Sequence, residues 1–115
     1  MPFKIKRIYE QSAESDGIRV LVDRLWPRGL TKKDARIDVW MKEIAPSPGL
    51  RKWFAHRVDR WEEFAVRYTS ELRLNPAVDN LRTLGSKSIV SLLYAAHDDE
   101  HNHAIVLKSV ISSEE

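Results

Sequence analysis

The stretch IVSLLYAA, residues 89–96, is almost continuously apolar and says most about the fold of this chain. Runs of this kind are typical of a strand that is covered on both faces in a parallel sheet, because neither of its faces meets water. We therefore expect a central strand here, with other layers of structure packed on both sides of it.

Three further strands are predicted upstream of this central one. Residues 3–8 and 18–23 are rich in apolar and β-branched side chains, and the pair Asp16-Gly17 supplies turn chemistry between them. Residues 37–42 alternate between apolar and polar side chains until Trp40 interrupts the pattern, which favours a strand at an edge of the sheet.

The middle of the chain carries helical signals. Thr31 followed by Asp34 resembles the opening of a short helix, and Ser47 before Pro48 is a favourable start for another. Apolar residues then recur at spacings of three and four along one face of a long helix: Trp61, Phe64, Ala65, Tyr68 and Leu72. We assign these side chains to the core. The cations around them lie among carboxylates, and we assign them to a solvated face of mixed charge: Arg51, Lys52, Arg57, Arg60 and Arg67.

Two more helices complete the pattern. Asn75-Pro76 ends the long helix and starts another, which Gly85 is expected to close in the left-handed conformation, and Asn102 is expected to cap the last one. Strands that alternate with helices predict a three-layer α/β/α sandwich around a small, mostly parallel sheet of about four strands. At 115 residues, we expect a single domain over 1–115.

The composition narrows the chemistry and the compartment. The chain has no cysteine, which excludes disulfides, a thiolate nucleophile and sulfur-ligated metal sites and fits a reducing compartment. Residues 1–7 lack the apolar run of a signal peptide, and no stretch has the length that crosses a bilayer. We expect a cytoplasmic protein with no membrane partner.

The net charge of +2 does not argue for nucleic acid, but the distribution of charge is uneven. Residues 19–36 hold a local excess of cations over Asp23 and Asp34: Arg19, Arg24, Arg28, Lys32, Lys33 and Arg36. Such an excess suits a phosphate or carboxylate.

Ligands of open α/β sheets bind beyond the carboxyl ends of the strands, and this rule selects two loops. In residues 23–29, Arg24 and Arg28 form a candidate clamp on an oxyanion, with Trp26 to stack on a ring and Asp23 beside them. The alternative is structural: Asp23 pairs with Arg24 or caps a turn, and Trp26 is an apolar plug that fixes the loop.

The second loop, residues 97–103, holds His97, Asn102 and His103 as candidates. His103 in the first turn of the last helix is placed to donate a hydrogen bond or act as a general acid on an anion. The three histidines of this loop and their neighbouring aspartates are residue types that bind metals, but their spacing matches no usual metal motif, so we predict no metal. The alternative is a solvated turn.

Several of these residues also carry a family resemblance. The chain resembles the YeaO-like bacterial proteins, which hold a domain of unknown function, in residues 22–29 (VDRLWPRG), 40–47 (WMKEIAPS), 50–54 (LRKWF), 92–98 (LLYAAHD) and 102–104 (NHA). The resemblance covers nearly the whole chain and implies an α/β fold. It also implies a Cys-His-Arg sequence in larger relatives where this chain has Asn102, His103 and Ala104, so that only His103 carries over and thiol chemistry is in doubt.

Two hypotheses follow, with the cofactor and the oligomeric state left open. The first is a protein that binds an anionic small molecule or nucleotide, bearing phosphate or carboxylate, between Arg24, Arg28 and His103; the sequence leaves open whether a reaction follows. The second is a non-catalytic regulatory or nucleic-acid-interacting module that uses residues 24–36 on phosphates.

Overall fold

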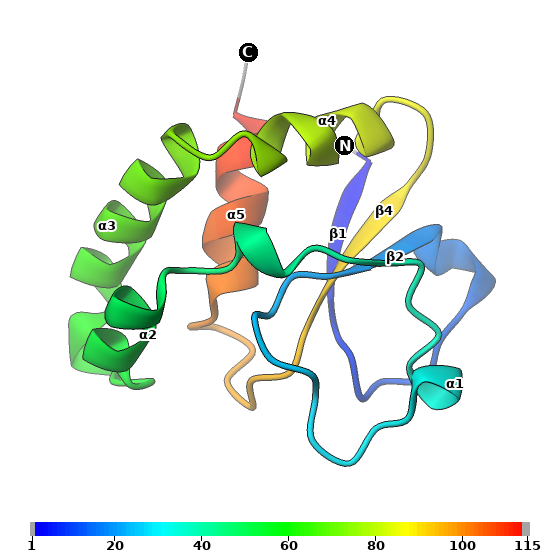
Figure 1. Cartoon of the computed structure of the whole chain (residues 1–115), viewed down its shortest axis with the longest axis horizontal. Helices are drawn as coiled ribbons and strands as arrows, with labels where there is room; N and C mark the ends of the chain where they lie inside the picture. The colour runs from blue at the N-terminus through cyan, green and yellow to red at the C-terminus, as the bar shows by residue number, and fades with distance from the viewer. Residues whose placement is uncertain (1, 114–115) are drawn as a thin grey trace.

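Four parallel strands form one sheet, in the order β1-β4-β2-β3 (Figure 1). They are β1 (Phe3–Arg7), β2 (Ile18–Leu21), β3 (Val39–Trp40) and β4 (Val90–Tyr94). The computed structural model describes residues 2–113, so the ends of the predicted domain, Met1, Glu114 and Glu115, lie outside the described residues. The α/β class, the parallel sheet and the central position of β4 are confirmed.

Strand β4 is central because it pairs with β1 on one side and β2 on the other, and all of its residues are buried. Successive side chains of a strand point to opposite faces, and the two faces of the sheet accordingly hold two separate clusters. Leu92 joins the larger cluster and Leu93 the smaller one, and in β2 Val20 and Leu21 divide in the same way. Each face of the sheet is therefore covered.

The covering layers differ in thickness. Helices α2 (Pro48–Phe54), α3 (Trp61–Arg73), α4 (Ala77–Gly85) and α5 (His103–Ser112) contribute to the larger cluster and lie together in Figure 1. The opposite face is covered by the single turn α1 (Lys32–Ala35) and its flanking loops, through Ala35, Trp26, Leu30 and Ile37. Three short 3-10 turns, η1 (Glu14–Asp16), η2 (Lys42–Ile44) and η3 (Val58–Arg60), complete the chain.

The predicted helix starts are confirmed by their caps. The side-chain oxygens of Thr31, Ser47 and Asn102 accept hydrogen bonds from backbone N–H groups three residues later, at 3.1, 3.2 and 3.2 Å. Each cap satisfies an N–H that the first helical turn leaves free. Among residues 2–113, no helix combines the length and the apolar character that crossing a membrane requires.

The prediction for Gly85 is wrong. Gly85 is the last residue of α4 and has no left-handed backbone, and Ser86 after it has φ of −71°. A Cβ atom at Gly85 would lie 2.3 Å from Cζ of Phe3, so a side chain is excluded by packing and not by a turn. Gly17 does adopt a left-handed backbone, with φ of 66°, in the predicted turn before β2.

A buried ion pair anchors the start of β2. Arg19 donates from Nη1 to Asp16 Oδ2 at 2.6 Å and from Nη2 to the carbonyl of Ala35, and Lys6 lies 2.9 Å from Asp16. Burial by itself would raise the pKa of Asp16, but the N–H of Ala13 and the two cations outweigh it and hold that pKa below its ordinary value. Arg19 is therefore removed from the basic surface around residues 19–36.

Candidate functional site

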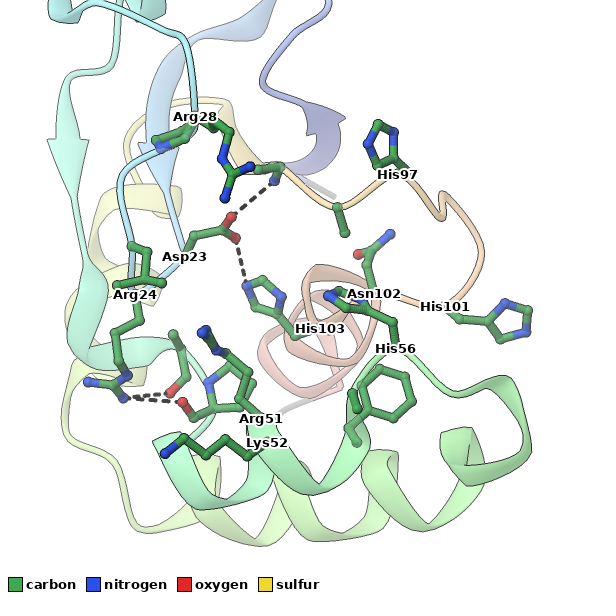
Figure 2. A pocket seen from close by; sticks show the side chains of 18 of the residues that line it. Asp23, Arg24, Arg28, Arg51, Lys52, His56, His97, His101, Asn102 and His103 are labelled. Atoms are coloured by element: carbon green, nitrogen blue, oxygen red, sulfur yellow. Dashed lines mark hydrogen bonds and ion pairs between the residues drawn. The ribbon is translucent and has the colours of Figure 1, made fainter.

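The two loops selected from the sequence meet at the carboxyl edge of the sheet, as Figure 2 shows. The loop after β2 and the loop after β4 line one cleft with a volume of about 680 Å³. The cleft is lined by every residue predicted for the site: Asp23, Arg24, Trp26, Arg28, His97, Asn102 and His103. Sequence reasoning therefore located the cleft, although the roles of its residues differ.

Asp23 and His103 face each other in the middle of the cleft (Figure 2). His103 Nε2 lies 3.1 Å from Asp23 Oδ1 and 3.0 Å from the carbonyl oxygen of Val22. The other carboxylate oxygen of Asp23 accepts the N–H of Ala95 at 3.1 Å. Asp23 thus joins the end of β2 to the segment after β4 and to the first residue of α5.

Arg24 and Arg28 lie on different sides of Asp23 in Figure 2, so they do not form one clamp side by side. Arg24 Nη2 donates to the carbonyl oxygens of Ala45 and Pro46 at 3.3 and 3.2 Å, and its Nε atom is buried without a partner among the described residues. Arg28 is exposed, and its side chain makes no hydrogen bond or ion pair within residues 2–113.

Two of the predicted binding residues are held by the fold. Trp26 donates from Nε1 to the carbonyl of Leu30 at 2.6 Å and packs edge-on against Trp40, with ring centroids 5.4 Å apart. Asn102 caps α5 and donates from its amide nitrogen to the carbonyl of Asp98 at 3.0 Å. Both side chains shape the cleft, and Trp26 matches the plug that the sequence left as an alternative.

Helix α2 supplies cleft residues that sequence reasoning assigned to a solvated face. Arg51 and Lys52 line the cleft, and neither side chain has a hydrogen-bond or ion-pair partner in the described part of the chain. Their neighbours on that face do pair: Arg57 Nη2 lies 2.9 Å from Asp59, and Arg67 forms an ion pair with Glu63. The sequence feature that comes closest to predicting this position is the pair of basic residues directly after Leu50.

The end of α2 places His56 at the same cleft. Ala55 and His56 have φ of 48° and 57°, a left-handed conformation that costs free energy for residues with a side chain. Helices usually leave this position to glycine, and no glycine or asparagine stands here. The turn places the exposed His56 side chain in the cleft lining, where it has no hydrogen-bond partner within residues 2–113.

The other three cleft histidines have partners that identify their protonated nitrogens. Arginine only donates, so His97 Nδ1 accepts from Arg7 Nη2 at 3.2 Å and carries no proton in this contact. His101 Nδ1, 3.0 Å from a carboxylate oxygen of Asp98, and His103 Nε2, beside a carbonyl, are the donating atoms. The N–H groups of Glu100 and His101 and the imidazole of His101 hold the pKa of Asp98 below its ordinary value.

The charge of the cleft is strongly one-sided. Its lining holds Arg24, Arg28, Arg51 and Lys52 against Asp23 as the one carboxylate among the described lining residues. No group of three or more His, Asp or Glu side chains within residues 2–113 is arranged to hold a metal ion. The fold and the cleft define a small parallel α/β protein with a cationic cleft at the carboxyl edge of its sheet.

Comparison with known proteins gives the family. A sequence model described as the inactive DUF488-N3 subclade matches residues 2–115. The uncharacterised protein YeaO of Escherichia coli is 41% identical over 114 residues, which cover 98% of this chain and 99% of YeaO. The uncharacterised protein Rv3073c of Mycobacterium tuberculosis is 41% identical over 109 residues, covering 95% and 92% of the two chains. The chain therefore belongs to the YeaO-like DUF488 family. No solved structure matches it.

Proposed function

We propose that this protein binds an anionic small molecule in the cytoplasm, one that carries a phosphate or carboxylate group, with nucleotides among the candidates. The site is the cleft at the carboxyl edge of the sheet. The observation that carries the proposal is the set of cations with no partner in the described chain: Arg28 from the loop after β2, and Arg51 and Lys52 from α2.

Physical chemistry favours an anion at this place. Exposed cations usually find a carboxylate partner or point to open water, whereas these three line a concave surface together with Arg24. Asp23 forms no ion pair with them, because its two oxygens face His103 and the N–H of Ala95, and one carboxylate does not balance four cations. The buried Nε of Arg24 is a further donor without a partner in residues 2–113, and a charge-assisted hydrogen bond to an anion would satisfy it.

Binding is favoured over catalysis in this proposal. The matching subclade is described as inactive, and the described lining of the cleft contains no serine, threonine or cysteine as a nucleophile. His103 Nε2 is directed at Val22 and Asp23, which suits a positioned donor better than a general acid at an open site.

Calorimetric titration with inorganic phosphate, ribose 5-phosphate, adenosine monophosphate and acetate tests the proposal. We expect at least one phosphate-bearing compound to bind, and the double substitution Arg51→Gln/Lys52→Gln to weaken it about tenfold or more, since each charge a few Å from the anion contributes about 1 kcal/mol in water. Lys87→Gln controls for the loss of an exposed positive charge outside the cleft lining, because Lys87 lies at the opposite end of β4. Equal affinities for the wild type and the double variant would exclude the cleft as the site.

A nucleic-acid-interacting module is the second candidate, and it rests on one observation. Lys32, Lys33 and Arg36 are exposed on and after α1, and their side chains have no hydrogen-bond or ion-pair partner among residues 2–113. This surface is separate from the cleft lining. Binding to mixed DNA or RNA fragments that weakens steeply with salt, and that Lys32→Gln/Lys33→Gln removes, would favour it over the small-molecule proposal.

A further inference from the structure

All of the histidines of this chain, four in number, line the one cleft. Imidazole is the side chain that gains or loses its charge around neutral pH, so the charge of this cleft depends on the proton concentration. The residues come from different parts of the chain: His56 follows α2, His97 and His101 lie in the loop after β4, and His103 begins α5. Their shared cleft is a property of the fold that no local motif encodes.

The contacts of the histidines divide them into groups. Three of them already have a polar or charged partner: Arg7 for His97, Asp98 for His101 and Asp23 for His103. His56 is exposed and has no hydrogen-bond or ion-pair partner among the described residues. His56 is therefore the histidine that has no such contact to give up when an anion enters the cleft.

The groups that face His56 across the cleft are mainly cationic. They are Asp23, Arg24 and Arg28 from the loop after β2, Arg51 and Lys52 from α2, His97 and His101 from the loop after β4, and His103 from α5. Without an anion, the four permanent positive charges repel any further positive charge in the cleft. An anion among them reverses the local field and favours the protonated imidazole.

We infer that the cleft selects a divalent oxyanion, the charge state of a phosphate monoester, and takes up a proton on His56 when the anion binds. This inference rests on the proposed anion-binding function. The cleft lining holds four cations and one carboxylate, and a doubly charged anion balances this net positive charge better than a singly charged ligand such as acetate does. A doubly charged anion also doubles the electrostatic attraction to each proton that is taken up. Linkage is reciprocal: if the anion promotes protonation, then protonation strengthens anion binding by the same factor.

The sign of the pH dependence follows from this linkage. Affinity for the anion is highest where the imidazole of His56 is readily protonated, and it falls as the pH rises. Sulfate is the sharpest probe, because it keeps its two negative charges over the whole range in which histidine titrates. We expect its affinity to fall about tenfold or more between about pH 6 and about pH 8, with protons taken up on binding in calorimetry across buffers of different ionisation enthalpy.

A substitution assigns the proton to its residue. His56→Gln keeps an amide at an exposed position and is expected to bring the affinity ratio between the two pH values close to one. A wild-type ratio that stays at one, or an unchanged ratio and proton uptake in His56→Gln, would overturn the inference. Acetate that binds as tightly as sulfate at low pH would overturn the selection for a divalent group.

The same titrations separate this inference from the proposed function. If sulfate binds in the cleft with an affinity that does not depend on pH, the inferred proton uptake is excluded, but the proposed anion site is retained. Sulfate, inorganic phosphate and phosphate monoesters that all fail to bind the wild type at about pH 6 remove the proposed function itself. Tighter binding of a monoester than of sulfate would identify the ester, and not the free ion, as the ligand.

Discussion

Asp23 Oδ1 lies 3.1 Å from Nε2 of His103, the first residue of α5, and this contact joins the end of β2 to the start of α5 across the cleft. The second oxygen of Asp23 holds the N–H of Ala95, so one carboxylate fixes both the loop after β4 and the start of the helix that follows. Asp23 is thus a structural centre of the cleft, and its negative charge opposes the anion that the cations around it favour.

Asp23→Asn is expected to strengthen anion binding. The asparagine retains an oxygen for the N–H of Ala95 and removes the negative charge, so the affinity for sulfate rises about fivefold, the factor that corresponds to about 1 kcal/mol for charges a few Å apart in water. Glu14→Gln, an exposed carboxylate outside the cleft lining, controls for net charge. Weaker sulfate binding by a folded Asp23→Asn protein would contradict the opposing effect of the Asp23 charge.

Gly85→Ala is expected to destabilise the protein by about 1–3 kcal/mol, because the added methyl group meets the ring of Phe3 and overpacks the core. Gly49→Ala is the matched control: it lies in α2 with open space around its Cβ position, so it leaves stability unchanged or raises it. Urea unfolding of both variants checks the difference. Equal free energies of unfolding for the two variants would mean that the ring of Phe3 in β1 does not pack closely against Gly85 in α4.

The buried Asp16 predicts a loss of stability in acid. Its pKa is lowered in the folded state, so its contribution is present above the unfolded value of about 4 and is lost as the pH falls through the folded value. Asp16→Asn is expected to lower the free energy of unfolding at neutral pH by about 3–5 kcal/mol, as for a broken buried pair, and to flatten the acid dependence below about pH 4. Denaturant titrations at several pH values measure both, and an acid dependence that matches the wild type would contradict the assignment to Asp16.

Ala55→Gly is expected to raise stability by about 1 kcal/mol, because glycine adopts the left-handed backbone without steric cost. Gly29→Ala gives the reverse comparison, since Gly29 has φ of 77° and open space at its Cβ position, and it is expected to lose about 1 kcal/mol. Thermal unfolding resolves changes of this size. A destabilised Ala55→Gly protein would mean that the turn after α2 is not left-handed.

Sequence patterns that span only a few residues were sufficient to predict much of this structure. The apolar run of β4 reflects burial on both faces, and the side chains of Thr31, Ser47 and Asn102 act on N–H groups only three residues away. The site loops were predictable for a related reason, because parallel strands deliver their carboxyl ends to one edge wherever they stand in the sequence.

Other features depend on contacts between distant residues. Arg51 and Lys52 reach the cleft because Leu50 and Phe54 pack α2 into the larger cluster, and charge pattern alone carries no sign of that direction. In the sequence, Gly85 stands at the end of a helical pattern, where a glycine usually serves as a cap. In the structure, the close contact with the ring of Phe3 in β1 is what requires a glycine there. The thin layer over the second face of the sheet, which α1 and its flanking loops form, likewise depends on contacts between distant residues.

The central claim is that an anion binds in this cleft, and a sulfate titration followed by amide NMR chemical shifts tests it most directly, with chloride at matched ionic strength as the control. The account predicts saturable shifts concentrated in residues 23–28, 51–56 and 95–103. Shifts that do not saturate, or that are concentrated in residues 32–36 instead, would contradict it.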